Sequence, residues 1–174
     1  CVSRLTYRKG SDLLVDVIPY ICRKYPKVHF IIGGDGPKKQ VLENMIKREE
    51  ISDRVEMLGM VAHKDVRNVL VRGHIFLNTS LTEAFCIAIL EAASAGLLVV
   101  STDVGGVREV LPSHYVHLAQ PQAEDIIQKL EIALKNYKNV NPMQMHEDVK
   151  KLYNWRDIAK RTERVYEYVL SKPK

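Results

Sequence analysis

The chain has 174 residues, 46% of them hydrophobic and 27% charged, so it can bury a core of its own, and a disordered chain is excluded. Lysine and arginine outnumber aspartate and glutamate by 26 to 21, but they form no long basic run, and we expect no nucleic-acid partner. The three cysteines are odd in number and lack metal-ligand spacing, which argues against a disulfide framework and a metal site.

The longest nearly apolar stretch, residues 84–100, is interrupted by Glu91, Ser94 and Gly96. It is shorter than the roughly 20 apolar residues that a membrane-spanning helix needs, so we expect this polypeptide to be soluble. The first ten residues contain no apolar signal core and open within a strand-like run. We therefore expect the sequence to be a fragment of a longer chain.

Short runs of strand type alternate with segments long enough to form helices. The expected strands are residues 1–5, 28–32, 54–58, 74–78, 98–101 and 115–118. Such alternation is typical of parallel strands joined by helical crossovers. From Glu124 onward the strand signals stop, and the spacing of apolar residues is helical. We predict one α/β domain over residues 1–174, with a doubly wound, Rossmann-like parallel sheet and a helical C-terminal extension.

Ligands of such a sheet bind beyond the carboxyl ends of its strands, so the residues after each strand are the candidates for a site. Arg4 and Lys9 follow the first strand, where a guanidinium and an ammonium suit phosphate oxygens, although both could be solvated surface charges. The turn GGDGP at residues 33–37 follows the second strand and does not match the dinucleotide fingerprint. Residues 59–61, after the third strand, could expose backbone to a ligand.

The stretch SLTEAFCIAILEAASAG follows the fourth strand and carries two glutamates among small and apolar residues. Its composition predicts a helix over residues 84–95, with Glu83 near the start. Three free amides are expected in the first turn, those of Phe85, Cys86 and Ile87. Together with the helix dipole, these amides favour an anion at the strand edge.

Glu91 would lie about two turns into this helix, among apolar neighbours, where an unpaired carboxylate costs several kcal/mol. If Glu83 is also helical, the two glutamates stand roughly 12 Å apart, at 1.5 Å per residue. Glycosidase carboxylates stand about 5 to 9.5 Å apart, so a hydrolytic pair is disfavoured. Two interpretations remain. Glu83 is a cap and Glu91 pairs with a core cation, or the two carboxylates bind the sugar ends of a nucleotide sugar whose diphosphate lies between them.

Taken together, these residues resemble the C-terminal domain of retaining family 4 glycosyltransferases of GT-B architecture. The resemblance rests on SRLTYRKG, on GGDGP, on the spacing of Glu83 and Glu91, and on the glycines 105–106 followed by REVLP. It covers nearly the whole chain. It implies that residues 1–174 are a nucleotide-sugar-binding domain, and that the acceptor-binding half, which precedes this domain in the family, is absent.

The resemblance also implies a role for each candidate residue. Arg4 and Lys9 would contact the donor diphosphate, and Glu91 would bind the ribose hydroxyls. Glu83, with the backbone of Phe85, Cys86 and Ile87, would contact the donor sugar and the distal phosphate. Met60 and Val61 would lie beside the uracil. Arg4, Lys9 and Glu83 are thus the expected catalytic residues, which stabilise the leaving diphosphate without a metal or other cofactor.

Residues 63–102 are similar to one branch of that family, which transfers GlcNAc from UDP-GlcNAc to phosphatidylinositol in the first step of glycosylphosphatidylinositol-anchor synthesis. Cys86 and Leu98 support this narrower resemblance, because most of the wider family has Gly at the first position and many members have Pro at the second. The resemblance implies a membrane transferase complex with other subunits, on the cytoplasmic face of the endoplasmic reticulum. We expect the isolated chain to bind the donor but to transfer little.

Three alternatives remain open. A family 4 domain could use another nucleotide sugar, or the same fold could be a non-catalytic assembly module. A nicotinamide-dependent oxidoreductase is the third, and the missing glycine fingerprint counts against it.

Overall fold

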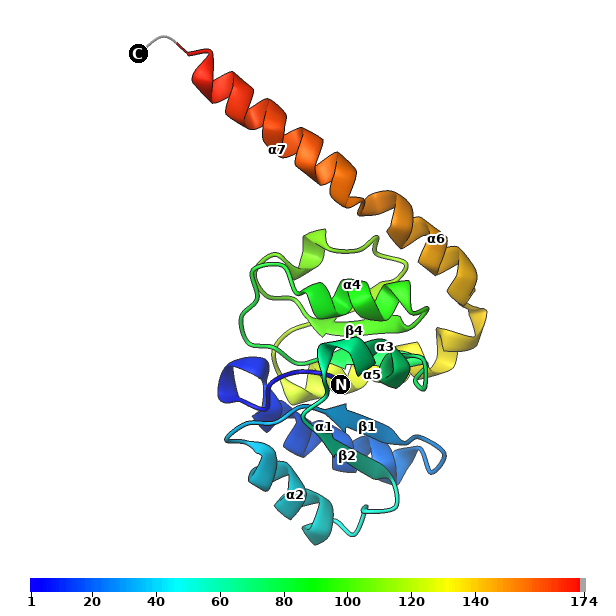
Figure 1. The fold of residues 1–174 in the computed structure, drawn as a ribbon. Helices are drawn as coiled ribbons and strands as arrows, with labels where there is room; N and C mark the ends of the chain where they lie inside the picture. The colour runs from blue at the N-terminus through cyan, green and yellow to red at the C-terminus, as the bar shows by residue number, and fades with distance from the viewer. Residues whose placement is uncertain (173–174) are drawn as a thin grey trace.

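Two parallel sheets with flanking helices make up the fold in a computed structural model, which describes residues 1–172 (Figure 1). In the first sheet, β1 (Phe30–Gly33) pairs with β2 (Val55–Gly59). The second sheet has the order β3-β4-β5, and its strands are β3 (Ile75–Asn78), β4 (Leu98–Thr102) and β5 (Val116–Ala119). The predicted parallel α/β class is confirmed.

The expected first strand, residues 1–5, is wrong as a regular strand. Only Val2 forms a bridge, with Gly33, and Ser3 is a bend, so residues 1–5 form no continuous strand beside β1. Its amides reach past the end of β1, because the Ser3 N–H donates to the Gly33 carbonyl and the Leu5 N–H donates to the Asp35 carbonyl. The Cys1 thiol donates to the Leu77 carbonyl of β3, so this segment links the two sheets.

The helices follow the predicted alternation. They are α1 (Ser11–Lys24), α2 (Lys39–Arg48), α3 (Val66–Leu70), α4 (Ile87–Ser94), α5 (Ala123–Asn136), α6 (Pro142–Leu152) and α7 (Trp155–Leu170). Short 3-10 turns are η1 (Tyr7–Lys9), η2 (His63–Asp65), η3 (Val107–Glu109) and η4 (Tyr137–Asn139). Within the described residues, none of these helices is both long and apolar enough to cross a bilayer.

The buried side chains form two clusters. One lies where α1, α2 and α5 cover the strands, and it contains Ile18, Ile32, Leu42 and Ile126. The other joins α4, β4 and α6 through Ile89, Val99 and Met145. Each cluster removes long apolar side chains from water, which is the main force that holds the helices on the sheets. This packing fixes the carboxyl ends of the strands. The loops that follow the strands then supply the residues of a candidate site.

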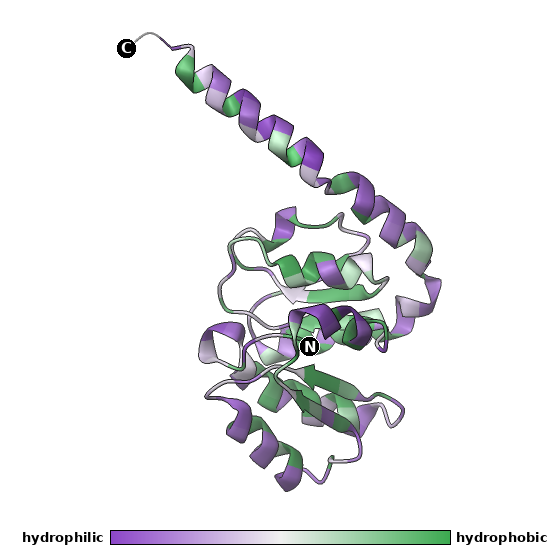
Figure 2. Ribbon diagram, in the orientation of Figure 1, coloured by the Kyte–Doolittle hydropathy of each residue, from purple (hydrophilic) through white to green (hydrophobic). Residues whose placement is uncertain are grey.

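The C-terminal extension begins at α6, whose first turn is capped by the Asn141 side chain, and Pro142 occupies the first helical position. Helix α6 packs on α4, where His146 Nδ1 lies 2.7 Å from the Ser94 carbonyl oxygen. Helix α7 then projects away from the domain, and none of its residues 155–170 is buried (Figure 1). The predicted helical extension is therefore confirmed, and Figure 2 shows apolar and polar residues alternating along α7.

Candidate functional site

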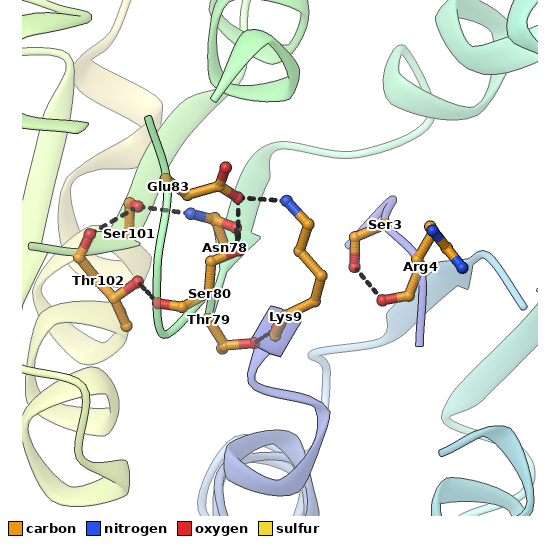
Figure 3. Close-up of polar contacts among 9 residues, drawn as sticks. All are labelled: Ser3, Arg4, Lys9, Asn78, Thr79, Ser80, Glu83, Ser101 and Thr102. Atoms are coloured by element: carbon orange, nitrogen blue, oxygen red, sulfur yellow. Dashed lines mark hydrogen bonds and ion pairs between the residues drawn. The ribbon is translucent and has the colours of Figure 1, made fainter. Parts of the chain in front are cut away.

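Buried polar side chains gather where β3 and β4 end. They are Asn78, Thr79, Ser80, Ser101 and Thr102. Asn78 donates from Nδ2 to Ser101 Oγ at 2.9 Å, which joins the ends of the two strands (Figure 3). Buried polar groups are costly unless they are hydrogen-bonded, so this cluster marks a place where the chain retains polarity inside its core.

Lys9 and Glu83 meet directly above this cluster. Lys9 Nζ lies 2.5 Å from Glu83 Oε1, although the two residues are 74 positions apart in the sequence (Figure 3). Their side chains are 34% and 10% exposed, respectively. Two further hydrogen bonds join the loops: the Thr79 side-chain Oγ1 donates to the Lys9 carbonyl, and the Leu81 N–H donates to the Arg8 carbonyl. The sequence predicted a common edge for these residues, and the structure adds the ion pair.

Gly10 allows the loop of Lys9 to approach the loop after β3. Its φ is +67°, and a Cβ atom on it would lie 1.7 Å from the Thr79 carbonyl oxygen. Gly105 does the same on the other side, with a φ of +54°, and a Cβ atom there would lie 1.8 Å from the Glu83 carbonyl oxygen. Only glycine meets both the conformational and the steric demand at such positions. The backbone of Glu83 is therefore packed directly against the glycine loop that follows β4.

The charge state of Glu83 follows from its partners. Burial raises the pKa of this carboxyl, but hydrogen bonds from Lys9 and Ser80, together with the Lys9 charge, lower it by more. The net result is a pKa below the ordinary value for glutamate. Glu83 is therefore ionised at neutral pH, and it can accept a hydrogen bond from a ligand hydroxyl.

The predicted helix start is wrong by three residues. Helix α4 begins at Ile87 instead of residue 84, and Glu83 lies in the loop before it. Cys86 breaks the helical conformation because its φ of 62° and ψ of 73° are left-handed. The Phe85 ring turns to pack edge-on against Tyr153, with a distance of 5.6 Å between ring centroids. Consequently the Ile87 amide lies in the first turn of α4, while those of Phe85 and Cys86 belong to the loop.

Cys86 lies beside the ionised Glu83. Burial, with the negative charge of Glu83 as the next cause, raises the pKa of its thiol to about 11. The thiol is therefore protonated at neutral pH. Left-handed backbone is unusual for a residue with a Cβ atom, and it agrees with the glycine that most of the wider family has at this position.

We expect Cys86→Gly to be more stable than Cys86→Ala by about 1 kcal/mol, because only the alanine retains the cost of left-handed backbone. At ordinary helix positions alanine is more stable than glycine. The control is therefore Ala88→Gly in the first turn of α4, which should lower the free energy of unfolding by about 0.5 to 1 kcal/mol. Denaturant unfolding of the three variants measures both differences. An alanine variant at position 86 as stable as the glycine variant would contradict the expectation.

Arg4, Met60 and Val61 lie outside the Lys9–Glu83 contact. Arg4 is exposed, its guanidinium points away from that pair in Figure 3, and within residues 1–172 it forms no ion pair. Met60 is 82% exposed after Gly59. Val61 lies against Gly33, where the loops after β1 and β2 meet. The structure thus brings Lys9 and Glu83 together and leaves the other three at neighbouring positions on the same edge.

Glu91 differs from its expected surroundings. It lies on α4 but is half-buried, and within residues 1–172 its carboxylate makes no hydrogen bond or ion pair. A core cation as its partner is therefore ruled out by the structure. Because α4 begins after Glu83, the separation of roughly 12 Å, which assumed one helix through both residues, does not apply. Glu91 remains available to a ligand.

Sequence reasoning missed the roles of Ser101, Thr102 and Gly105. Ser101 and Thr102 are fully buried at the end of β4, and Thr102 Oγ1 donates to the Ser80 carbonyl. The available signal was a run of polar residues directly after an apolar strand, at the edge where ligands bind. No group of three or more His, Cys, Asp or Glu side chains in residues 1–172 could hold a metal ion, and the expectation that no metal is needed remains a prediction.

Comparison with known proteins identifies the class that this fold and site define. Residues 1–159 match the family described as glycosyl transferases group 1, and the chain belongs to that family. Over 97% of this chain, the sequence is 61% identical to a phosphatidylinositol N-acetylglucosaminyltransferase subunit of Arabidopsis thaliana. It is 56% identical to the Homo sapiens subunit of the same name, also over 97% of this chain. The resemblance predicted from the sequence is confirmed.

The match covers only part of those relatives. The chain spans 38% of the Arabidopsis protein and 35% of the human one. Among solved structures, Anabaena Alr3699/HepE in complex with UDP-glucose superimposes with a TM-score of 0.78 and 22% identity, over 98% of this chain and 48% of that one. This likeness confirms the predicted Rossmann-like α/β fold, which the chain shares with glycosyltransferases of GT-B architecture.

Proposed function

We propose that this chain is the donor-binding domain of a glycosyltransferase that transfers GlcNAc from UDP-GlcNAc to phosphatidylinositol with retention at the anomeric carbon, the first step of glycosylphosphatidylinositol-anchor synthesis. The observation that carries the proposal is the Lys9–Glu83 pair at the carboxyl edge of the strands. A cation and an ionised carboxylate in contact offer one group for phosphate and one for sugar hydroxyls. The names of the two relatives supply the reaction and the acceptor.

In this proposal Lys9 acts on the diphosphate. Without a ligand its charge is neutralised by Glu83, and an arriving diphosphate offers the same ammonium a second anionic partner. Stabilisation of the charge that develops on the leaving diphosphate lowers the barrier to transfer. Arg4 would add a two-pronged donor from the neighbouring loop, and the Ile87 amide would add the first turn of α4.

The remaining groups would hold the two ends of the donor. Glu83 would accept hydrogen bonds from the GlcNAc hydroxyls, and the loop amides of Phe85 and Cys86 would donate hydrogen bonds to the sugar and the distal phosphate. The half-buried Glu91 carboxylate would accept hydrogen bonds from the ribose. Met60 and Val61 would border the uracil beyond β2. No metal or other cofactor enters this scheme.

Two further elements of the proposal concern the longer protein. Phosphatidylinositol would bind to a part of the chain outside these residues, and the enzyme would work with other subunits in a complex on the cytoplasmic face of the endoplasmic reticulum membrane. A non-catalytic module on the same fold is disfavoured, because Lys9, Glu83 and Glu91 are all present and the first two are in contact.

Calorimetric titration tests the donor site directly. We expect this chain to bind UDP and UDP-GlcNAc in preference to GDP-mannose and NAD, and the double variant Arg4→Ala/Lys9→Ala to lose that binding. The control is Lys160→Ala/Arg161→Ala, which removes the same charge from α7, far from the strand edge. Failure of the wild-type chain to bind any of these ligands at millimolar concentration would contradict the proposal.

Product analysis tests the reaction itself. A full-length chain that contains this domain, assayed in membranes with labelled UDP-GlcNAc, should form GlcNAc-phosphatidylinositol, and the Lys9→Ala variant should form far less. Transfer of a different sugar would replace the proposed donor while leaving the class of enzyme intact.

A further inference from the structure

Ser80 lies between the buried cluster and the proposed donor site. Its side chain is fully buried, and its Oγ atom is 2.7 Å from Glu83 Oε1 and 2.9 Å from Asn78 Oδ1 (Figure 3). Both of these oxygens can only accept a hydrogen bond, since Glu83 is ionised and the other is an amide oxygen. A serine hydroxyl has one proton. It can therefore serve only one of the two acceptors at a time.

The orientation of the Asn78 amide is fixed from below. Ser101 Oγ donates its proton to the Thr102 carbonyl at 3.1 Å, so it must accept from Asn78 Nδ2. The Asn78 amide oxygen is thereby directed at Ser80. Ser80 itself is held in place because its carbonyl accepts from Thr102 Oγ1. The Ser80 hydroxyl is thus held in place by these hydrogen bonds, and it has two alternative acceptors, Asn78 Oδ1 and Glu83 Oε1.

The hydrogen bond from Lys9 to Glu83 affects how strongly the hydrogen bond from Ser80 stabilises the Glu83 carboxylate. In the unliganded structure, Glu83 Oε1 already accepts from Lys9 Nζ, and the same oxygen lies within reach of Ser80. When Lys9 turns part of its hydrogen bonding to a diphosphate, the carboxylate loses some of its compensation. An ionised carboxylate that is mostly buried is strongly disfavoured without a donor. Ser80 is the nearest group that can supply one.

We propose that Ser80 is a positioning residue of the donor site: its hydroxyl, shared between Asn78 and Glu83 in the unliganded chain, holds Glu83 Oε1 inward so that Oε2 faces the ligand, and it donates to Glu83 for more of the time when Lys9 engages the diphosphate. This inference rests on the proposed function for the identity of the ligand. The underlying hydrogen bond does not, because it exists in the unliganded chain. Two independent measurements can therefore separate them.

The first measurement needs no ligand. The charged and titratable groups that face Glu83 are the Lys9 ammonium and the Cys86 thiol, and Ser80 adds a neutral donor. Since the Ser80 hydrogen bond lowers the pKa of Glu83, Ser80→Ala should raise that pKa, as followed by carboxyl carbon NMR during a pH titration. Ser94→Ala is the matched control, because Ser94 is a hydrogen-bonded serine of α4 that contacts His146 instead.

The second measurement uses UDP-GlcNAc. Ser80→Ala should weaken its binding about tenfold, the size expected when a charged group loses a hydrogen bond. The acid limb of the pH profile of binding should move to higher pH, which a loss of packing alone would not produce. In a Lys9→Met background, the fold-change in UDP-GlcNAc binding caused by Ser80→Ala should differ from tenfold. The reason is that Glu83 can no longer exchange a hydrogen bond from Lys9 for one from Ser80 when the ligand binds.

The outcomes divide cleanly. If the wild-type chain binds no UDP ligand but Ser80→Ala raises the pKa of Glu83, the proposed function fails while the Ser80–Glu83 contact stands. If the wild-type chain binds UDP-GlcNAc and Ser80→Ala changes neither the pKa of Glu83 nor the pH profile, the role of Ser80 is overturned. Circular dichroism confirms that each variant is folded before either comparison is made.

Discussion

Replacement of Lys9 with methionine is expected to weaken UDP-GlcNAc binding by about 10- to 100-fold, the range that corresponds to loss of a charge-assisted hydrogen bond. Methionine keeps an unbranched, flexible side chain one atom shorter than that of lysine, and it removes the charge together with the N–H donors. Without the Lys9 charge beside it, the Glu83 carboxylate would also repel the diphosphate. Arg8→Met is the matched control, because Arg8 is an exposed cation in the same turn η1 whose side chain does not contact Glu83.

The Lys9 variant should also change the response to acid. Because the folded pKa of Glu83 is lowered, its contribution to stability is present above the unfolded pKa and is lost as the pH falls through the folded value. Without Lys9 the folded pKa rises toward the unfolded value, so the stability that the variant loses on acidification should be smaller than in the wild-type chain. Unfolding curves between pH 3 and 7 measure it. Equal affinities for Lys9→Met and Arg8→Met would contradict the assigned role of Lys9.

Gly105→Ala is expected to lower the free energy of unfolding by about 3 kcal/mol, since it combines left-handed backbone with a clash against main chain. The new Cβ would lie 1.8 Å from the Glu83 carbonyl oxygen, which no side-chain movement can relieve. For a domain of this size the midpoint of thermal unfolding should fall by about 6 to 12 °C. The loop of Glu83 must also shift, so donor binding should weaken.

Gly59→Ala separates the two causes. Gly59 has a φ of +68°, close to that of Gly105, but a Cβ there would meet nothing within 4 Å. Gly59→Ala should therefore lower the free energy of unfolding only by the cost of left-handed backbone, about 1 kcal/mol. Scanning calorimetry on both variants gives the difference. If Gly105→Ala and Gly59→Ala are equally stable, the close packing of Gly105 against the loop of Glu83 contributes nothing to the free energy of unfolding.

Much of the fold is encoded locally. Apolar runs of strand type and helical spacing of apolar residues depend on a few neighbouring positions, so most strands and the long helices α1 and α5 are predictable. The segment 1–5 is different, because its pairing depends on where β1 ends and on the bends at Gly34 and Gly36. Such long-range hydrogen bonding leaves no pattern in the segment itself.

The site was predictable at the level of the edge and not at the level of contacts. Parallel strands place Lys9 and Glu83 at a common edge, whatever the loops do. Their ion pair depends on Gly10 packing against Thr79, a tertiary contact between loops. The start of α4 was missed because the helix-forming residues of the stretch begin with Ala84, and the left-handed backbone of Cys86 delays the helix to Ile87. Tertiary packing decided these details.

Helix α7 has a consequence for how this molecule can be studied. None of its 16 residues is buried, and an isolated helix of that length is marginal in water. Its amide protons should therefore exchange through local fraying, at rates independent of the unfolding of the core. Any surface that covers the apolar residues of α7, such as Trp155 and Val169, would slow that exchange in residues 155–170 alone. The helix thus serves as an intrinsic reporter of whatever the domain packs against.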